Sequence, residues 1–436
     1  MHKTIIPVKK TIFICLSACF LALSCRQPAP LVDKTFADSL ALHYTPGTAV
    51  AATAKDIGFW RARIDTASTG MVNESHYAAA LVARFHQTGD IRDVKKADSI
   101  LRKVSAAFNG KETGPLLALC RYAILQHRFS TADSLLTIAR NDGLKPYDAL
   151  STSFDVDFEL GRYTNATLYV QQLKPYKDYG YYFRLSRLDH LNGAMDSSIQ
   201  AMLTAASLAE SSVYLQSVAL SNAADLYIHN EELNKAAALY LQCIRMNPAD
   251  LHSITGLGWI ALVHDKDTAV AKAMFGLVHR QNQLPDPVFK LYQLAQAGGD
   301  SLMQLSYARA FEQQATMPVY GNMYNKYLLE LYTGIMHEPA RAVAITVGEL
   351  HNRSTPQTNA WYAWALFSAG LKEQAYTVYR ESVSGKPLEG LELYYMGRLM
   401  EGLGKGYNAQ QFYKAASKNK YDLSPGMATD LAKRLE

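Results

Sequence analysis

Aromatic residues and arginines are the side chains in this sequence whose types and spacing could do chemistry, and that chemistry is binding. They are Trp259, Trp361, Trp364, Phe367, Tyr394, Tyr395 and Arg398, with Arg184 and Arg187 further upstream. Large rigid rings and planar guanidinium groups dominate binding hot spots, because they offer wide contact area. The pattern predicts a partner-binding surface. The alternative is that the tryptophans fill a core and the arginines lie in solvated ion pairs.

Motifs for catalysis, cofactors or metals are not found in the sequence. It has no His-Glu-x-x-His, no Gly-x-Ser-x-Gly, no Cys-x-x-Cys and no phosphate-binding glycine-rich loop. The nearest set of metal-binding residue types is His264-Asp265-Lys266-Asp267, in a predicted turn where charged residues are common. We therefore expect a protein that is not an enzyme and has neither cofactor nor metal site. The alternative is an enzyme whose site is assembled from scattered residues.

The first 25 residues have the pattern of an export signal. Lys3, Lys9 and Lys10 precede an uncharged run of 14 residues from Thr11 to Ser24, which is shorter than the roughly 20 apolar residues of a membrane-spanning helix. The run ends in Leu21-Ala22-Leu23-Ser24-Cys25, which resembles the lipobox of bacterial lipoproteins. The resemblance implies a signal peptide over 1–24, attachment of diacylglycerol and a further acyl chain such as palmitate at Cys25, and a flexible tether over 25–50. The alternative is an ordinary secretory signal in which Cys25 occurs by chance.

The residues after Cys25 and the net charge indicate where the protein lies and which partners it does not bind. Residues 26–30 read Arg-Gln-Pro-Ala-Pro, whereas surface-exported lipoproteins of the Bacteroidetes type usually carry acidic residues after their cysteine. We therefore expect an exported protein anchored to the outer membrane at its periplasmic face. Loss of the three leader lysines would lower the formal charge from +5 to +2, which excludes the basic surface that nucleic-acid binding needs.

A recurring pattern of small and aromatic residues organises the rest of the chain. In one copy it comprises Leu220, Ala223, Ala224, Tyr227, Ala236, Tyr240, Cys243 and Pro248. It resembles the tetratricopeptide repeat, a helix-turn-helix unit of about 34 residues in which small residues let two helices approach. The step from Ala132 to Ala166 is 34 residues, and so is the step from Ala375 to Ala409. The ranges that match best are 113–146, 147–178, 217–250, 356–389 and 390–423.

The resemblance implies an all-α, tetratricopeptide-like solenoid over residues 51–436, a right-handed superhelix of about ten antiparallel helix pairs. Alternating strand patterns are absent. Residues 285–355 match the repeat poorly, but their apolar spacing still predicts helices at 289–297, 302–314, 323–332 and 340–350. In such a stack the first helix of each pair lines a concave face, and the aromatic residues and arginines named above fall at its inward positions.

A protein or peptide partner held in this concave groove is the function that the resemblance implies. The expected protein is thus a membrane-anchored, non-catalytic scaffold for protein-protein interaction in the cell envelope. The alternative is a nutrient-binding lipoprotein that resembles the glycan-binding, starch-utilisation type. Such proteins are usually longer and have large insertions between repeats, whereas the repeats here follow one another closely.

Overall fold

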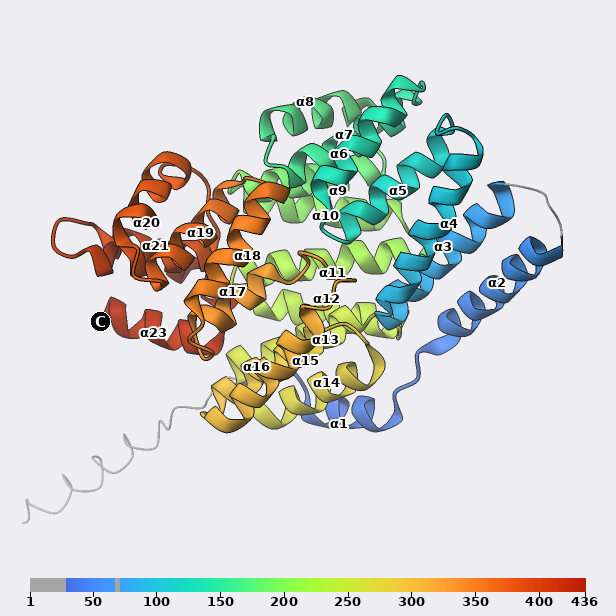
Figure 1. Ribbon diagram of the computed structural model, residues 1–436. Coiled ribbons are helices and arrows are strands. Elements are labelled where there is room, and N and C mark those ends of the chain that lie inside the picture. The colour runs from blue at the N-terminus through green and yellow to red at the C-terminus, as the bar shows by residue number, and fades with distance from the viewer. Residues whose placement is uncertain (1–28, 67–70) are drawn as a thin grey trace, which may run out of the picture.

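Helices make up all the regular structure in residues 29–66 and 71–436, the part of the chain that the computed structural model describes (Figure 1). Ten consecutive hairpins form its body. The first five are α3 (Met71–Thr88) with α4 (Ile91–Ala107), α5 (Thr113–Leu125) with α6 (Phe129–Asn141), α7 (Pro146–Glu159) with α8 (Tyr163–Leu173), α9 (Tyr179–Leu191) with α10 (Met195–Leu208), and α11 (Val213–His229) with α12 (Leu233–Met246). The other five are α13 (Leu251–Ile260) with α14 (Thr268–Gln281), α15 (Asp286–Ala297) with α16 (Ser301–Ala315), α17 (Asn325–Thr333) with α18 (Pro339–Asn352), α19 (Pro356–Ser368) with α20 (Lys372–Val378), and α21 (Gly390–Leu403) with α22 (Ala409–Ala416). The predicted all-α, tetratricopeptide-like solenoid of about ten helix pairs is confirmed.

Three further helices and four short helical turns complete the array. The helices are α1 (Lys34–His43), α2 (Gly47–Thr66) and α23 (Pro425–Leu435), and the turns are η1 (Lys174–Tyr176), η2 (Ala261–Asp265), η3 (Tyr379–Val383) and η4 (Ser417–Asp422). None of the helices in the described residues is both long and apolar enough to span a bilayer.

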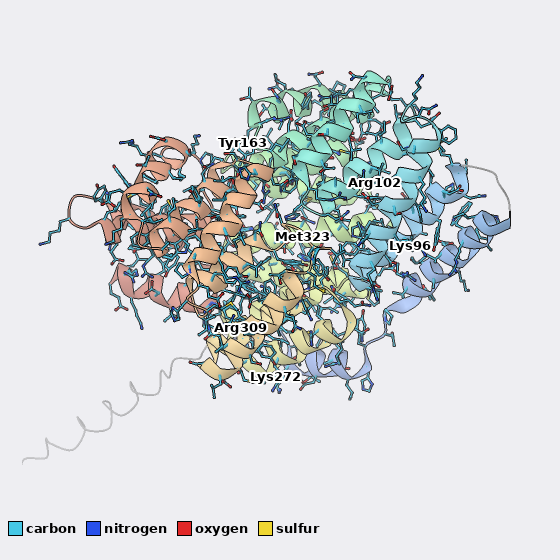
Figure 2. All side chains as sticks on the ribbon, in the orientation of Figure 1. Lys96, Arg102, Tyr163, Lys272, Arg309 and Met323 are labelled. Atoms are coloured by element: carbon cyan, nitrogen blue, oxygen red, sulfur yellow. The ribbon has the colours of Figure 1, made fainter. Side chains whose placement is uncertain are left out.

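Small residues at the helix crossings explain why the hairpins form where the sequence pattern places them. Ala132, Ala166 and Ala375 are all fully buried, so the second helix of each pair lies directly against its neighbours. Gly161, in the turn between α7 and α8, has a φ of +75°, a left-handed conformation that glycine adopts without strain. Side chains fill the space between the hairpins (Figure 2). Local periodicity therefore sets the hairpins, and their packing buries the core.

Successive turns of the superhelix touch one another. The contacts are Thr88 O with Gln283 N (2.9 Å), Tyr163 Oη with Gln357 Oε1 (3.5 Å), Glu159 Oε2 with Arg353 Nη1 (3.2 Å), and His229 Nδ1 with Asp422 Oδ2 (2.7 Å). In each pair the two residues are 193 to 195 positions apart, which is about 5.7 repeats of 34 residues. One superhelical turn therefore takes just under six hairpins, and the second turn packs against the first.

The segment before the repeats is folded where the structure describes it, so the predicted tether over 25–50 is wrong from residue 29 onward. The backbone amides of Leu31 and Val32 donate to the two carboxylate oxygens of Asp265, at 2.9 and 3.0 Å. Helix α1 then packs on α14, with Val32 and Ala37 buried. The segment is folded because it binds a buried carboxylate and an apolar surface that lie more than 200 residues away in the sequence. No local sequence pattern could predict contacts at that distance.

The end of the chain lies against the inner helices. After α22, η4 and α23 contact α11 and α15, and Leu423 and Leu431 are buried. The backbone amide of Gly426 donates to Gln296 Oε1 in α15 at 2.8 Å. The C-terminal segment 417–435 therefore covers part of the concave face of the first turn.

Candidate functional site

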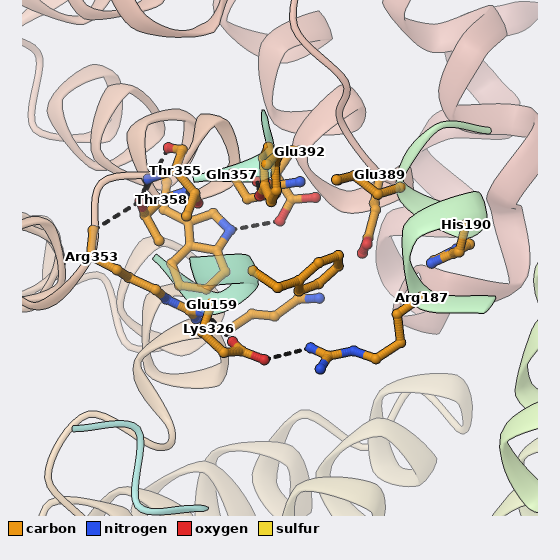
Figure 3. A pocket seen from close by; sticks show the side chains of 14 residues that line it. Glu159, Arg187, His190, Lys326, Arg353, Thr355, Gln357, Thr358, Glu389 and Glu392 are labelled. Atoms are coloured by element: carbon orange, nitrogen blue, oxygen red, sulfur yellow. Dashed lines mark hydrogen bonds and ion pairs between the residues drawn. The ribbon is translucent and has the colours of Figure 1, made fainter. Parts of the chain in front are cut away.

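A cavity of about 300 Å³ lies between the two superhelical turns (Figure 3). The first turn contributes Phe158, Glu159, Tyr163, Arg187, His190 and Leu191, from α7, α8 and α9. The second turn contributes Lys326, Arg353, Thr355, Gln357, Thr358, Trp361, Glu389 and Glu392, from α17, α19, α21 and the segments before α19 and α21. The site exists only because the superhelix closes on itself.

A network of ion pairs joins the turns at the edge of the cavity. Glu159 accepts from Arg187 Nη2 at 2.6 Å within the first turn and from Arg353 Nη1 at 3.2 Å in the second. Arg353 also donates from Nε to Glu349 Oε1 at 2.7 Å, and the Glu349 side chain is only 1% exposed. Figure 3 shows Glu159 between the two arginines. Because charge-assisted bonds are the strong ones, this network fixes the spacing of the turns.

Polar groups inside the cavity keep hydrogen-bonding capacity that no other group in the described residues uses. Trp361 Nε1 donates to Glu392 Oε1 at 2.6 Å, while Oε2 of the same buried carboxyl group has no hydrogen-bond partner. Lys326 and the side chain of Glu389 make no hydrogen bond or ion pair with any described residue. Glu392 is only 1% exposed, whereas Lys326 is half-buried and Glu389 is exposed. Buried polar groups are almost always satisfied, so the free oxygen of Glu392, with Lys326 and Glu389 in the same lining, marks a place where a polar ligand or solvent can bind.

The charges of these three side chains influence one another. Burial lowers the pKa of Lys326, but the carboxylates of Glu392 and Glu389 outweigh burial and hold that pKa above its ordinary value. Burial raises the pKa of Glu389, but the positive charge of Lys326 brings it below its ordinary value. For Glu392, burial dominates and raises the pKa. Lys326 and Glu389 are therefore both ionised and opposite in charge without a direct ion pair, and Glu392 is a less acidic carboxyl group in the same lining.

Two histidines connect the cavity to the C-terminal segment. The rings of His190, in the cavity wall, and His229 lie 5.1 Å apart, and His229 Nδ1 is 2.7 Å from Asp422 Oδ2. Burial lowers the pKa of His190, which favours the neutral ring. For His229 burial acts in the same direction, but the bond to Asp422 outweighs it and raises the pKa. The polar interior is thus continuous from the cavity to residues 417–424.

The aromatic residues predicted to line an open groove are mostly inside the protein. Those with exposed fractions of 9% or less are Trp259, Trp361, Trp364, Tyr394 and Tyr395. The predicted exposure is wrong for these five, because the two turns pack on each other and the C-terminal segment packs on both. Their role in binding a partner stays a prediction.

Several of these residues hold the chain's own segments together. Trp364 stacks on Tyr395, with ring centroids 4.8 Å apart and an interplanar angle of 6°, and it donates to Thr333 Oγ1 at 3.0 Å. Trp259 Nε1 donates to the carbonyl oxygen of Tyr421 at 2.9 Å. These contacts join the last hairpins and the C-terminal segment to the inner helices.

The remaining predicted residues have contacts of the same kind. Tyr394 Oη donates to Asp430 at 2.6 Å, and Arg398 reaches the same carboxylate at 3.2 Å. Arg184 pairs with Asp155 at 2.6 Å, outside the cavity lining. Phe367 lies 5.6 Å from Trp364, ring centre to ring centre. Of the nine residues, only Arg187 and Trp361 line the cavity.

The sequence did not predict most of the charged residues of the cavity. Lys326, Glu389 and Glu392 follow no short motif, and Lys326 falls in the range 285–355 that matches the repeat poorly. For Lys326 and Glu392, the sequence offers only one hint, a charged residue among apolar residues on a predicted helix. Such residues are common on any helix, so the hint does not single out a site. Cys25, the predicted lipidation site, lies outside the described residues.

Comparison with known proteins finds similarity among solved structures. No family model matches the sequence, and no curated protein matches it. Similar solved structures include a human IFIT1 dimer with PPP-AAAA, at 12% identity and a TM-score of 0.32, covering 84% of this chain and 94% of that one. Another is the TPR domain of P58(IPK), at 11% identity and a TM-score of 0.25, covering 92% and 97%. At these values the fold assignment rests on the hairpins themselves.

The arrangement is chemically suited to binding. No group of three or more histidine, cysteine, aspartate or glutamate side chains placed to hold a metal ion occurs in the described residues. Donors and acceptors instead converge on a space at the lower end of the size range of small-molecule sites.

Proposed function

We propose that this protein is a non-catalytic scaffold that holds an extended segment of a protein partner against its inner face. The observation that carries the proposal is that this face holds a short, kinked helical turn of the chain itself, η4. Trp259 binds the main-chain carbonyl of Tyr421, His229 binds Asp422, and Lys420 Nζ lies 3.0 Å from Glu231 Oε2. Recognition of an extended peptide uses the same combination of main-chain and side-chain contacts.

The cavity is the part of this inner face that a partner segment would reach. It adjoins residues 417–424 through His190 and His229, so a bound segment would lie beside the chain's own. An intact helix, about 10–12 Å across with its side chains, is too wide for a cavity of this volume. The proposed ligand is therefore an extended segment or a side chain, and no nucleic acid, cofactor or catalytic step is part of the proposal.

We also propose that a lipid at Cys25 anchors the scaffold to the outer membrane at its periplasmic face. The support is the leader and the lipobox-like sequence before Cys25. Leu31, six residues later, is fixed to Asp265. An extended chain of six residues spans at most about 21 Å. The corner of the solenoid at η2 would therefore lie within that distance of the bilayer surface.

Site-specific photocross-linking in intact cells tests the scaffold. Helix α8 offers a matched pair of positions, because Tyr163 lines the cavity and Leu168 is half exposed outside that lining. With p-benzoylphenylalanine at each position, we expect a discrete adduct from position 163 and none of that size from position 168. No adduct at 163, or the same adduct at both, would contradict binding at the inner face.

A separate experiment tests the anchor. Cys25→Ser should abolish incorporation of labelled palmitate and move the protein from the membrane fraction to the soluble fraction. Cys120→Ser is the matched control, because Cys120 is fully buried against α6 and can accept no lipid in the folded protein. Unchanged labelling of the Cys25 variant would show that the lipobox-like sequence is not used.

A further inference from the structure

We propose that the cavity between the turns is a binding site for a small, neutral, polyhydroxylated molecule such as a mono- or disaccharide. The proposal does not depend on the scaffold function, although a partner segment that entered the cavity would compete with the small ligand for the same lining. Three observations support it: hydrogen-bonding groups in the cavity without a partner among the described residues, the near balance of positive and negative charge around them, and the aromatic side chains in the wall.

The unused groups define what the ligand must offer. Lys326 can only donate hydrogen bonds, whereas Glu389 and the buried Oε2 of Glu392 accept them. A hydroxyl group does both, so one hydroxyl can accept from Lys326 and donate to a neighbouring carboxylate. Several hydroxyls on one small ring could bond to all three groups at once, and the burial of Glu392 makes a partner for its free oxygen most valuable.

The charge balance excludes a ligand with net charge. Three cations, Arg187, Lys326 and Arg353, face three carboxylates, Glu159, Glu389 and Glu392. Glu349, which pairs with Arg353 behind the wall, adds one negative charge. The raised pKa of Glu392 favours the neutral form of that carboxyl group, which offsets the added charge. A charged ligand would bring an uncompensated charge into this partly dry space, which is costly.

The position of Lys326 also argues against a zwitterion such as a free amino acid. Its ammonium group feels the fields of Glu389 and Glu392. A ligand carboxylate placed on Lys326 would therefore face two like charges, whereas a hydroxyl group would not. Phe158, Tyr163 and Trp361 supply carbon surface for the apolar edges of a sugar ring. Sites with a few converging polar groups on an aromatic wall are typical of small-molecule binding.

Isothermal titration calorimetry of the purified protein tests the proposal. The probes are glucose, galactose, N-acetylglucosamine, maltose and cellobiose, with glycine, glutamate and putrescine as a counter-panel. We expect at least one sugar to bind, with an affinity that changes little with ionic strength because the ligand is neutral. Binding by none of the sugars, or by the counter-panel instead, would overturn the proposal.

Paired variants locate the binding. Lys326→Met and Glu389→Gln should each weaken the sugar about tenfold or more, the usual effect of losing a hydrogen bond to a charged group. Lys272→Met, on the outside of α14 and labelled in Figure 2, and Glu373→Gln, exposed on α20, are the controls and should leave the affinity within about twofold. If each cavity variant changed the affinity no more than its control, the sugar would not bind in this cavity and the proposal would be wrong. Circular dichroism checks folding, and Glu389→Gln carries the test if Lys326→Met does not fold.

Discussion

Arg353→Ala is the substitution that most directly tests whether contacts between the turns stabilise the protein. Arg353 bonds to Glu159 in the first turn and to the buried Glu349, and its guanidinium carbon lies 4.6 Å from the centre of the Phe129 ring. Its loss leaves Glu349 with only the hydrogen bond from Asn325. Breaking a buried ion pair costs about 3–5 kcal/mol, and the 16% exposure of Arg353 puts the expected loss near about 3 kcal/mol.

Urea unfolding followed by circular dichroism measures this loss. Arg353→Lys keeps the charge but not the planar fork, so we expect a smaller loss of about 1–2 kcal/mol. Arg380→Ala is the matched control, because the pair of Arg380 with Glu381 is exposed on both sides and should contribute at most about 0.5 kcal/mol. If the Arg353→Ala midpoint shifted no more than that of Arg380→Ala, the contact between turns would contribute nothing to stability.

Three further predictions address burial, packing and the N-terminal segment. Burial raises the pKa of Glu330 from 4.5 to about 7, so its ionised form destabilises the folded state as the pH rises through this range. Glu330→Gln should stabilise the protein above pH 7 by up to about 3 kcal/mol and leave it unchanged near pH 4, in urea titrations at both pH values; an equal gain at both would contradict this reasoning. In α13, a Cβ at Gly258 would lie 2.7 Å from the Phe275 ring, so Gly258→Ala should lose about 1–3 kcal/mol in thermal unfolding. Gly276→Ala in α14 meets only an arginine tip at 3.6 Å and should be neutral or gain up to about 1 kcal/mol, and similar losses for both would refute the packing argument. Asp265→Asn should weaken the hold on the N-terminal segment by about 1.5–3 kcal/mol and speed proteolysis within residues 29–50, whereas an unchanged cleavage rate would show that this carboxylate does not hold the segment.

The hairpins could be predicted from the sequence because their packing is local. Ala132 and Ala166 stand 34 residues apart, and each lies where two helices cross. Each hairpin contacts mainly its neighbours, so a periodic signal of short range contains most of the information needed. Even in the range 285–355, where the repeat pattern fails, the apolar spacing placed α15 to α18 close to their observed bounds.

The closure of the superhelix could not be predicted in the same way. The number of hairpins per turn depends on small rotations that add up over about six units, and no residue type signals such a rotation. Trp361 and Tyr395 were therefore expected on an open face, although both are buried. The cavity was missed for the same reason, because Glu159 and Arg353 are 194 residues apart and meet only when the turns close.

Contacts between neighbouring hairpins differ in chemical character from the contacts between turns at the cavity. Within and between neighbouring hairpins the contacts are apolar, as for Ala132 and Phe275, which are almost completely buried. Around the cavity the contacts between turns are ion pairs and hydrogen bonds, which water can replace when the turns separate. The two turns also share one apolar core, which contains Val156 of the first turn and Trp361 of the second, so local opening is confined to the polar edge at the cavity. Under the proposed function, a partner segment would therefore enter at this polar edge, where water can replace the bonds between turns.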